Sequence, residues 1–327
     1  MHAVVTGCAG FIGSHLSERL LADGWHVTGI DSFTDYYDPA EKRRNLDGLR
    51  SEPRFELIED DVATAPLDRL LRQRPAVFHI AAQAGVRGSF GEEFTRYLHD
   101  NVRSTQRVFE AAVEAGVRRV VYASSSSVYG NAEVYPCGEA TPLSPRSPYG
   151  VTKATCEDLA RIARHGGLET VGLRYFTVYG PRQRPDMAMR RLCETAIGGP
   201  SFELYGDGEQ SRDFTFVADA VDATVRSMTT ENVDPILNIG GGQEASMNQV
   251  ISIIQRLAGR RLLVERMSTQ RGDVQRTCAD TTVARRQLGW RPSTSLHEGL
   301  AAELEFVSER RAAMASSGAV LAAVGSA

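Results

Sequence analysis

The first half of the chain alternates between short apolar runs and longer segments with apolar residues at helical spacing. The apolar runs predict strands at 3–6, 26–30, 55–59, 76–80, 119–123 and 170–174. Helical periodicity separates them, at 11–22, 67–73, 92–115 and 149–165. Short apolar strands between amphipathic helices indicate a parallel sheet covered on both faces. The expected fold class is therefore α/β, a doubly wound parallel sheet of the Rossmann type with a smaller mixed C-terminal lobe.

The second half of the chain has a less regular pattern. Gly and Pro breakers interrupt it, and helices are predicted at 218–228, 246–258 and 296–310. We expect residues 1–176 to form the nucleotide-binding domain, with the segment around 213–240 returning to it. Residues 177–311 should form mainly the substrate-binding lobe. Residues 312–327 are rich in Ala, Ser and Gly, which predicts a frayed, flexible tail.

Composition and charge exclude several classes of protein. The chain has 327 residues, of which 42% are hydrophobic and 24% charged, as in an ordinary globular protein. With a formal net charge of -4 it has no excess of Lys and Arg to neutralise phosphates, so no nucleic-acid partner is expected. No apolar stretch approaches the length of a membrane span. The five Cys residues are scattered without a CxxC pair, which indicates no metal site and favours the cytoplasm.

A glycine-rich loop joins the first predicted strand to the first helix. Gly7, Gly10 and Gly13 have the spacing GxxGxxG. Such glycines permit a tight turn and let the backbone approach a pyrophosphate at the helix N-terminus. The same spacing also occurs in turns that bind nothing, so it needs support from its context.

Asp31, at the end of the second strand, gives that support. A carboxylate at this position accepts hydrogen bonds from an adenosine ribose and repels a 2′-phosphate. Ser32 follows it instead of an Arg, which favours NAD over NADP, although Arg43 and Arg44 lie further on. Asp61, after the third strand, either contacts the adenine edge or is simply solvated.

Two further motifs carry candidate chemistry. Tyr149 and Lys153 are four residues apart and share one face of a helix. A cation beside a phenol favours its deprotonated form, so Tyr149 can act as a general base. The serine-rich segment 124–127 follows a strand, where its hydroxyls either bind a reacting sugar oxygen or satisfy their own turn.

Taken in order, these motifs resemble the NAD-dependent epimerase/dehydratase family, within the extended short-chain dehydrogenases/reductases. The match includes SSSSVYG, SPYGVTK and LRYFTVYGPRQRPDMA and runs from Met1 to about Leu300. It implies Ser125, Tyr149 and Lys153 as the catalytic residues, a tightly bound NAD, and a homodimer formed through the helices at 92–115 and 149–165. The implied cofactor contacts are Gly7, Gly10, Phe11, Ile12, Gly13, Asp31, Ser32, Lys42, Asp61, Val62, Ala81, Ala82, Gln83, Asn101, Tyr149, Lys153 and Tyr175.

Details of the motifs narrow the choice within the family. Residues 125–127 include no carboxylate, whereas the 4,6-dehydratases and decarboxylases of the family carry Asp or Glu in this segment. Segments 31–44, 81–87 and 177–187 resemble UDP-glucuronate 4-epimerases. An Arg near the sugar suits a uronic acid because a guanidinium pairs with a carboxylate at two points. Arg184 and Arg87 are both candidates, and solvated loop charge is the alternative for Arg184.

The resemblance also implies a UDP-sugar site and a reaction. The substrate contacts implied are Arg87, Ser125, Ser126, Ser127, Tyr149, Thr177, Arg184, Phe202, Tyr205, Arg212, Arg271 and Asp273. The expected reaction is reversible C4 epimerisation of UDP-glucuronate to UDP-galacturonate through a 4-keto intermediate. The alternatives are a UDP-hexose 4-epimerase, a UDP-glucuronate decarboxylase, and a nucleotide sensor without catalysis.

Overall fold

The centre of the molecule is a seven-stranded parallel sheet. The computed structural model describes residues 1–73, 75–269 and 272–324. The strand order is β11–β6–β5–β4–β1–β2–β3, and every neighbouring pair is parallel. The order reverses beside β1 and β4, and in such sheets a crevice opens at the carboxyl ends of the strands. The strands are β1 (His2–Thr6), β2 (His26–Asp31), β3 (Phe55–Glu59), β4 (Ala76–His79), β5 (Arg119–Ser125), β6 (Glu169–Tyr175) and β11 (Ile236–Ile239).

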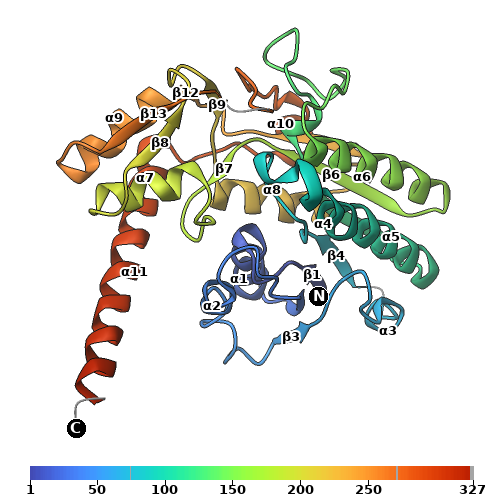
Figure 1. The fold of residues 1–327 in the computed structure, drawn as a ribbon. Coiled ribbons are helices and arrows are strands. Elements are labelled where there is room, and N and C mark those ends of the chain that lie inside the picture. The colour runs from blue at the N-terminus through green and yellow to red at the C-terminus, as the bar shows by residue number, and fades with distance from the viewer. Residues whose placement is uncertain (74, 270–271, 325–327) are drawn as a thin grey trace.

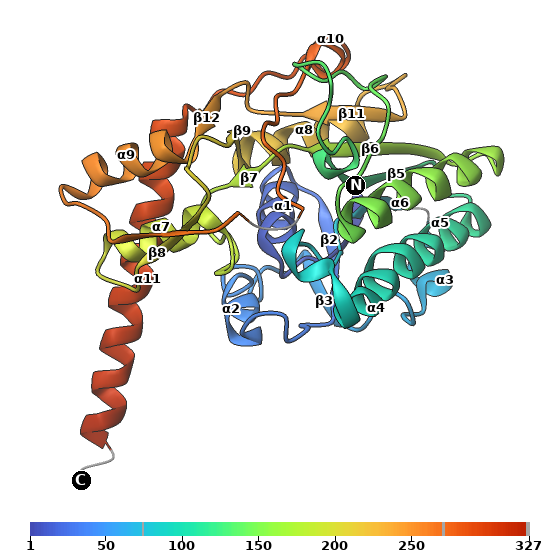
Figure 2. The same cartoon turned by 45° about the horizontal axis from the view of Figure 1, so that its top comes forward.

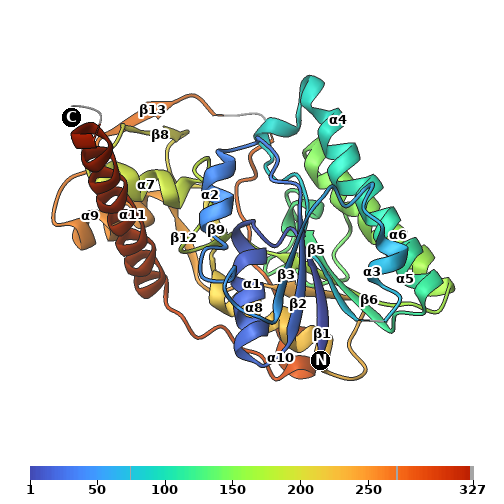
Figure 3. The same ribbon diagram turned by 90° about the horizontal axis from the view of Figure 1, so that it is seen from below.

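Helices cover both faces of this sheet, as Figure 3 shows. One face carries α1 (Phe11–Ala22), α8 (Val217–Thr229) and α10 (Thr282–Leu288). The other face carries α3 (Leu67–Leu70), α5 (Ser104–Ala115) and α6 (Pro148–His165). The predicted doubly wound α/β fold is confirmed.

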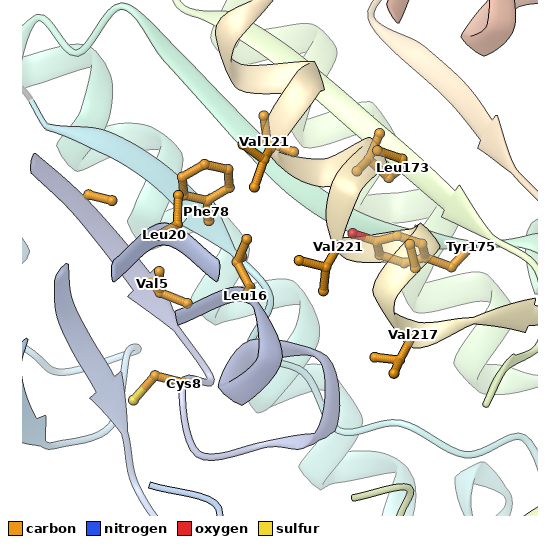
Figure 4. Close-up of a cluster of buried hydrophobic side chains, with 14 of the residues drawn as sticks. Val5, Cys8, Leu16, Leu20, Phe78, Val121, Leu173, Tyr175, Val217 and Val221 are labelled. Carbon is orange, nitrogen blue, oxygen red and sulfur yellow. The ribbon is translucent and has the colours of Figure 1, made fainter. Parts of the chain in front are cut away.

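Figure 4 shows the core between α1, α8 and the sheet. Leu16 and Leu20 lie one turn apart on α1 and are completely buried, as are Phe78 and Val121 on the strands. Burying an aliphatic or aromatic side chain of this size contributes about 1.5–3 kcal/mol. This packing fixes α1 firmly, so its N-terminus is held at the carboxyl edge of the sheet.

A smaller lobe has its own apolar core, in which α11 packs against α7 and α9. Its main elements are α7 (Ala188–Ala196), β8 (Phe202–Tyr205), α9 (Met247–Ala258), β13 (Val264–Met267) and α11 (Leu296–Val324). Short strand pairs link it to the sheet domain, namely β7 (Val178–Tyr179) with β10 (Thr215–Phe216), and β9 (Ser211–Asp213) with β12 (Glu244–Ser246). The remaining short elements are α2 (Pro39–Arg44), η1 (Arg87–Ser89), η2 (Gly91–Glu93), α4 (Phe94–Tyr97), η3 (Leu98–Arg103) and η4 (Ser126–Val128).

Three helices differ from their predicted form. The helix predicted at 67–73 is only the short α3 (Leu67–Leu70). The predicted helix at 92–115 is a run of α4, a π-helical segment η3, and α5. The prediction that the last helix ends near Arg310 was wrong, because α11 continues to Val324 and extends away from the smaller lobe (Figures 1 and 2). The Ala-rich composition beyond residue 311 favours helix despite its Ser and Gly. Among the described residues, no helix is both long and apolar enough to cross a membrane.

Candidate active site

A cavity of about 740 Å³ lies at the carboxyl ends of the strands, walled by the sheet domain and the smaller lobe. It gathers nearly all of the residues predicted from the sequence. On the sheet side these are Gly7, Gly10, Phe11, Ile12, Gly13, Asp31, Ser32, Lys42, Asp61, Val62, Ala81, Ala82, Gln83, Ser125, Ser126, Ser127, Tyr149, Lys153, Tyr175 and Thr177. The others are Arg87, Arg184, Phe202, Tyr205, Arg212 and Asp273. Arg271 lies outside the described residues.

The glycine-rich loop leaves no room for side chains. Gly7 has φ +72°, and a Cβ on it would lie 2.8 Å from the backbone of Ala81. A Cβ on Gly13 would lie 2.0 Å from the carbonyl oxygen of Gly7. Gly10 caps α1 without any side-chain hydrogen bond. The first-turn N–H groups therefore remain available to an anion, which is the arrangement that binds a pyrophosphate.

Asp31 holds the loops around it and lines the cavity. Its carboxylate accepts hydrogen bonds from the backbone N–H of Ala9 at 3.0 Å and of Phe33 at 2.9 Å. Burial raises the pKa of Asp31. Each carboxylate oxygen keeps a second lone pair for a ribose hydroxyl. Asn45, which the sequence analysis missed, supports the same loop by donating a hydrogen bond to the Ala9 carbonyl at 3.0 Å.

The two nearby arginines point to other partners. Arg43 stacks on the Phe33 ring at 4.2 Å and forms two hydrogen bonds to Glu59, at 2.9 and 2.5 Å. Arg44 lies 4.0 Å from Asp38. Neither lines the cavity, so neither guanidinium is positioned for a 2′-phosphate.

Asn101 lies behind the cavity wall and does not line it, in contrast to its predicted direct contact. Its side chain exchanges hydrogen bonds with the backbone N–H and carbonyl of Gln83, at 2.8 and 3.0 Å. It also donates to the Thr152 hydroxyl at 2.9 Å. Asn101 therefore holds the strand end that carries Gln83 against the helix that carries Tyr149.

A buried imidazole supports the same strand end. His79 lies between the hydroxyls of Thr6 at 2.8 Å and Thr105 at 3.0 Å. Burial, with the charge of Lys153, lowers the pKa of His79 to about 3, so the ring is neutral. Thr6 Oγ1 in turn accepts a hydrogen bond from the Ala81 N–H at 3.2 Å.

Tyr149 and Lys153 project from the first turns of α6 toward the end of β5. Pro148 starts this helix, and the Ser147 hydroxyl caps it by accepting from the Gly150 N–H at 3.1 Å. Lys153 is 3% exposed and donates a hydrogen bond to the Ala123 carbonyl at 2.8 Å. The helix also touches the serine turn, because a Cβ on Gly150 would lie 2.6 Å from the Ser127 carbonyl oxygen.

A buried ion pair, absent from the sequence-based prediction, fixes the other side of this helix. Glu157, one turn beyond Lys153, accepts hydrogen bonds from Arg174 at 2.9 and 2.7 Å and from the Ser124 hydroxyl at 2.5 Å. Arg174 also donates to Tyr129 at 2.7 Å. The side chains of Arg174 and Glu157 are 5% and 9% exposed. This pair ties β5, α6 and β6 together beneath the catalytic candidates.

Aromatic and charged residues form the end of the cavity on the smaller lobe. The Arg87 guanidinium stacks on the Tyr205 ring at 4.2 Å and pairs with Asp273 at 3.0 Å. Burial lowers the pKa of Arg212. The carboxylate of Asp273 opposes this shift, and the guanidinium of Arg87 adds to it. Arg191, which was not predicted, lines the same region.

Arg184 also lines the cavity, with a different set of partners. Its side chain is 17% exposed and forms an ion pair with Asp186 at 2.9 Å. Tyr36 lies beside the pair, with its ring centroid 5.5 Å from the guanidinium carbon. Arg87 and Arg184 therefore line the cavity with different partners, a distinction that the sequence did not give.

Comparison with known families agrees with this geometry. Residues 3–240 match the model described as the NAD dependent epimerase/dehydratase family. The chain belongs to this family. The family's name includes the cofactor NAD, and the uncapped helix terminus, the glycine cradle and Asp31 form a site that fits it.

Individual members of the family resemble the chain along nearly its whole length. The uncharacterised UDP-glucose epimerase YtcB of Bacillus subtilis is 42% identical over 311 residues, covering 94% of this chain and 98% of its own. UDP-glucuronic acid 4-epimerase from Bacillus cereus, solved with UDP-glucuronic acid and NAD, is 37% identical, with a TM-score of 0.92 and coverage of 94% and 99%. MoeE5, solved with UDP-glucose and NAD, is 41% identical, with a TM-score of 0.86 and coverage of 95% and 99%.

Proposed function

We propose that this chain interconverts UDP-glucuronate and UDP-galacturonate by epimerisation at C4 of the sugar. The observation that carries the proposal is Arg184, whose largely buried guanidinium lines the same cavity as Tyr149. A carboxylate is the group that a planar guanidinium recognises best. The neighbouring turn at 125–127 supplies hydroxyls but no carboxylate that could serve as the second acid of a dehydratase.

The sheet side of the cavity holds NAD in this proposal. The pyrophosphate lies at the N-terminus of α1, Asp31 binds the adenosine ribose, and Lys153 with Tyr149 binds the nicotinamide ribose. NAD supplies reversible hydride transfer at C4. The remaining contacts are Phe11, Ile12, Ser32, Lys42, Asp61, Val62, Ala81, Ala82, Gln83 and Tyr175.

The smaller lobe holds the UDP group. Tyr205 and Phe202 offer ring faces and edges to the uracil, and Arg212 and Arg87 offer cations to the diphosphate. Asp273 accepts hydrogen bonds from the uridine ribose. This arrangement leaves the sugar between Tyr149, Thr177 and the serine turn.

The chain's own residues move one proton during the reaction. The phenolic oxygen of Tyr149 takes the proton of the C4 hydroxyl as C4 is oxidised, and returns it when C4 is reduced from the other face. Ser125 hydrogen-bonds the same sugar oxygen, and the Lys153 ammonium stabilises the deprotonated phenol. The ordered contacts of Lys153 and α6 keep these groups in place while the sugar turns.

Arg184 has a second role in this proposal, which is to prevent decarboxylation of the 4-keto intermediate. A sugar with a ketone at C4 and a carboxylate at C5 is a β-keto acid, which loses carbon dioxide when the C–C bond to the carboxylate overlaps the carbonyl π system. A two-point contact with Arg184 holds that bond near the plane of the ketone. The same residue therefore selects the uronate and protects it.

Product analysis tests this proposal. Purified protein is incubated with UDP-glucuronate, and the products are separated by chromatography and identified by NMR. UDP-galacturonate is expected, with no net change in the NAD pool. A UDP-pentose with carbon dioxide would instead identify a decarboxylase, and no turnover of any UDP-sugar would indicate a nucleotide sensor.

Epimerisation of a neutral UDP-hexose is the second candidate. The observation in its favour is that Asp186 already neutralises Arg184. A hexose without a carboxylate thus meets no unpaired charge. Comparing turnover of UDP-glucose and UDP-glucuronate at equal concentrations separates the two candidates.

We further propose a cytoplasmic homodimer. All five cysteines are free thiols, as suits a reducing compartment.

The outer surface of η3 and α6 exposes Leu98, Val151 and Ile162, which a partner subunit would cover. Light scattering should give twice the chain mass, and Ile162→Asp should shift it toward the monomer. A wild-type monomer at working concentration would contradict the proposal.

A further inference from the structure

The guanidinium of Arg184 is fully engaged along one edge by Asp186. Its Nε donates to Asp186 Oδ1 and its Nη2 to Asp186 Oδ2, both at 2.9 Å. The Tyr36 hydroxyl donates a further hydrogen bond to Asp186 Oδ2 at 3.3 Å. All three residues line the cavity. Asp186 thus presents to Arg184 the same two-oxygen geometry that a uronate carboxylate would present.

This pair lies in the part of the cavity near Gly85 and Tyr149. A Cβ on Gly85 would lie 2.9 Å from the Tyr36 hydroxyl and 3.9 Å from Arg184 Nη2, so the backbone at Gly85 makes room for the pair. Burial by itself would lower the pKa of Arg184, but the hydrogen bonds and charge of Asp186 raise it, with a contribution from Tyr149. Tyr97 links this region to Tyr149, because its hydroxyl donates a hydrogen bond to the Gly85 carbonyl at 2.9 Å and its ring centroid lies 6.2 Å from that of Tyr149.

The two partners differ in their access to solvent. The side chain of Arg184 is 17% exposed and that of Asp186 is 43% exposed. Leaving a largely buried guanidinium without an anion costs more than returning an accessible carboxylate to water. Asp186 is therefore the partner that can leave, provided that another anion takes its place.

From these contacts, and resting on the proposed function, we propose that Asp186 is an internal substitute for the substrate carboxylate. With a UDP-uronate bound, the fork of Arg184 transfers to the sugar carboxylate, and Asp186 turns away from Arg184 and Tyr36 into water. With a neutral UDP-hexose bound, the Arg184–Asp186 pair stays closed. Asp186 thereby determines specificity, letting one cavity accept both classes of UDP-sugar at the expense of affinity for the uronate.

Asp186→Asn tests the proposal because it removes the charge and nearly keeps the shape. UDP-glucuronate no longer competes with an internal anion, so its KM should fall about tenfold while kcat changes little. UDP-glucose leaves the guanidinium without an anion, so its kcat/KM should fall about tenfold. Opposite effects on the two substrates are expected only if Asp186 takes the place of the substrate carboxylate.

A neighbouring ion pair supplies the matched control. Arg182, on the same loop as Arg184, pairs with Glu18 on α1 at 2.6 Å. Neither residue lines the cavity. Glu18→Gln also removes one carboxylate charge and should leave the ratio of kcat/KM for the two substrates unchanged. A loss shared equally by both substrates in Asp186→Asn, or an unchanged ratio, would overturn the proposal.

Binding measurements keep this test independent of turnover. Calorimetric titration of the NAD-loaded protein should give a lower Kd for UDP-glucuronate in Asp186→Asn and a higher Kd for UDP-glucose. The proposed function fails if wild type makes no UDP-galacturonate. The proposed role of Asp186 as a stand-in for the substrate carboxylate fails if the two Kd values move together. Tyr36→Phe is the second variant, since it weakens the closed pair without changing charge. It should shift both Kd values in the same directions as Asp186→Asn, by a smaller factor, and no shift would count against the proposal.

Discussion

The ammonium nitrogen of Lys153 lies 6.0 Å from the centre of the Tyr149 ring, one turn further along α6. Both side chains line the cavity, where the proposed reaction assigns the phenolic oxygen of Tyr149 to proton transfer. Tyr149→Phe removes only that oxygen, so turnover should fall by about 100- to 10,000-fold. Steady-state kinetics measure the loss, while thermal unfolding and NAD content serve as controls and should match wild type. Near-normal turnover would exclude Tyr149 as the base.

The contacts of Asp31 and Arg43 predict which dinucleotide the protein carries. Protein purified without added cofactor should release NAD(H) on denaturation, identified by mass spectrometry. Asp31→Ala should weaken NAD binding by about ten- to a hundredfold, because hydrogen bonds to a charged group are lost. Glu59→Gln frees Arg43 but keeps Asp31, so it should still bind NAD. Release of NADP(H) from wild type would show that Asp31 does not exclude the 2′-phosphate.

The different partners of Arg184 and Arg87 predict different losses on mutation. Arg184→Ala should lower kcat/KM for UDP-glucuronate by about one to two orders of magnitude and change UDP binding much less. Without Arg184, the bond to the sugar carboxylate can leave the plane of the C4 ketone. The 4-keto intermediate should then lose carbon dioxide and yield some decarboxylated product. Arg87→Ala should weaken UDP itself, and thus every UDP-sugar alike. Wild-type kinetics for Arg184→Ala, with a uronate-specific loss for Arg87→Ala, would transfer the role to Arg87.

Glu303 on α11 predicts a pH dependence of stability. Its side chain is completely buried, accepts a hydrogen bond from the Gly180 N–H at 3.2 Å, and its Oε1 has no partner among the described residues. Burial raises the pKa of Glu303 well above its usual range. The folded state therefore holds a proton that the unfolded state loses, and stability falls as pH rises above about 4.3.

Glu303→Gln removes this dependence. Relative to the variant, wild type should lose up to about 1.4 kcal/mol of unfolding free energy per pH unit until the folded-state pKa is reached. Urea unfolding of both proteins between about pH 5 and pH 8 measures the difference. Parallel stability curves would mean that Glu303 is not held protonated.

Local patterns were sufficient to predict six of the seven strands of the sheet domain, whereas β11 was not predicted as a strand. Each strand of that domain is a short apolar run, and β1, β2 and β3 begin or end within one residue of the predicted bounds. The motifs that follow these strands converge because parallel strands share one carboxyl edge. Thus Gly7, Asp31 and Tyr149 reach one cavity although the chain separates them widely.

Contacts between distant segments could not be predicted in the same way. Glu157 and Asn45 had no motif to mark them, since each matters through a partner that only the fold brings near. Asp186 lies within the quoted segment 177–187, but nothing in the sequence showed that its carboxylate pairs with Arg184. Asn101 was singled out, but nothing in the sequence showed that its amide faces Gln83 instead of the cavity. The π-helical segment that carries Asn101 departs from regular helical geometry, which periodicity cannot detect.

The central claim is that C4 is oxidised and reduced again while the sugar keeps its carboxylate. UDP-glucuronate carrying deuterium at C4 tests this claim most directly, with the product examined by NMR and mass spectrometry. The account predicts UDP-galacturonate that retains the deuterium at C4, with an intact carboxylate and no exchange with solvent. Loss of the label to water, or a decarboxylated product as the main species, would contradict it.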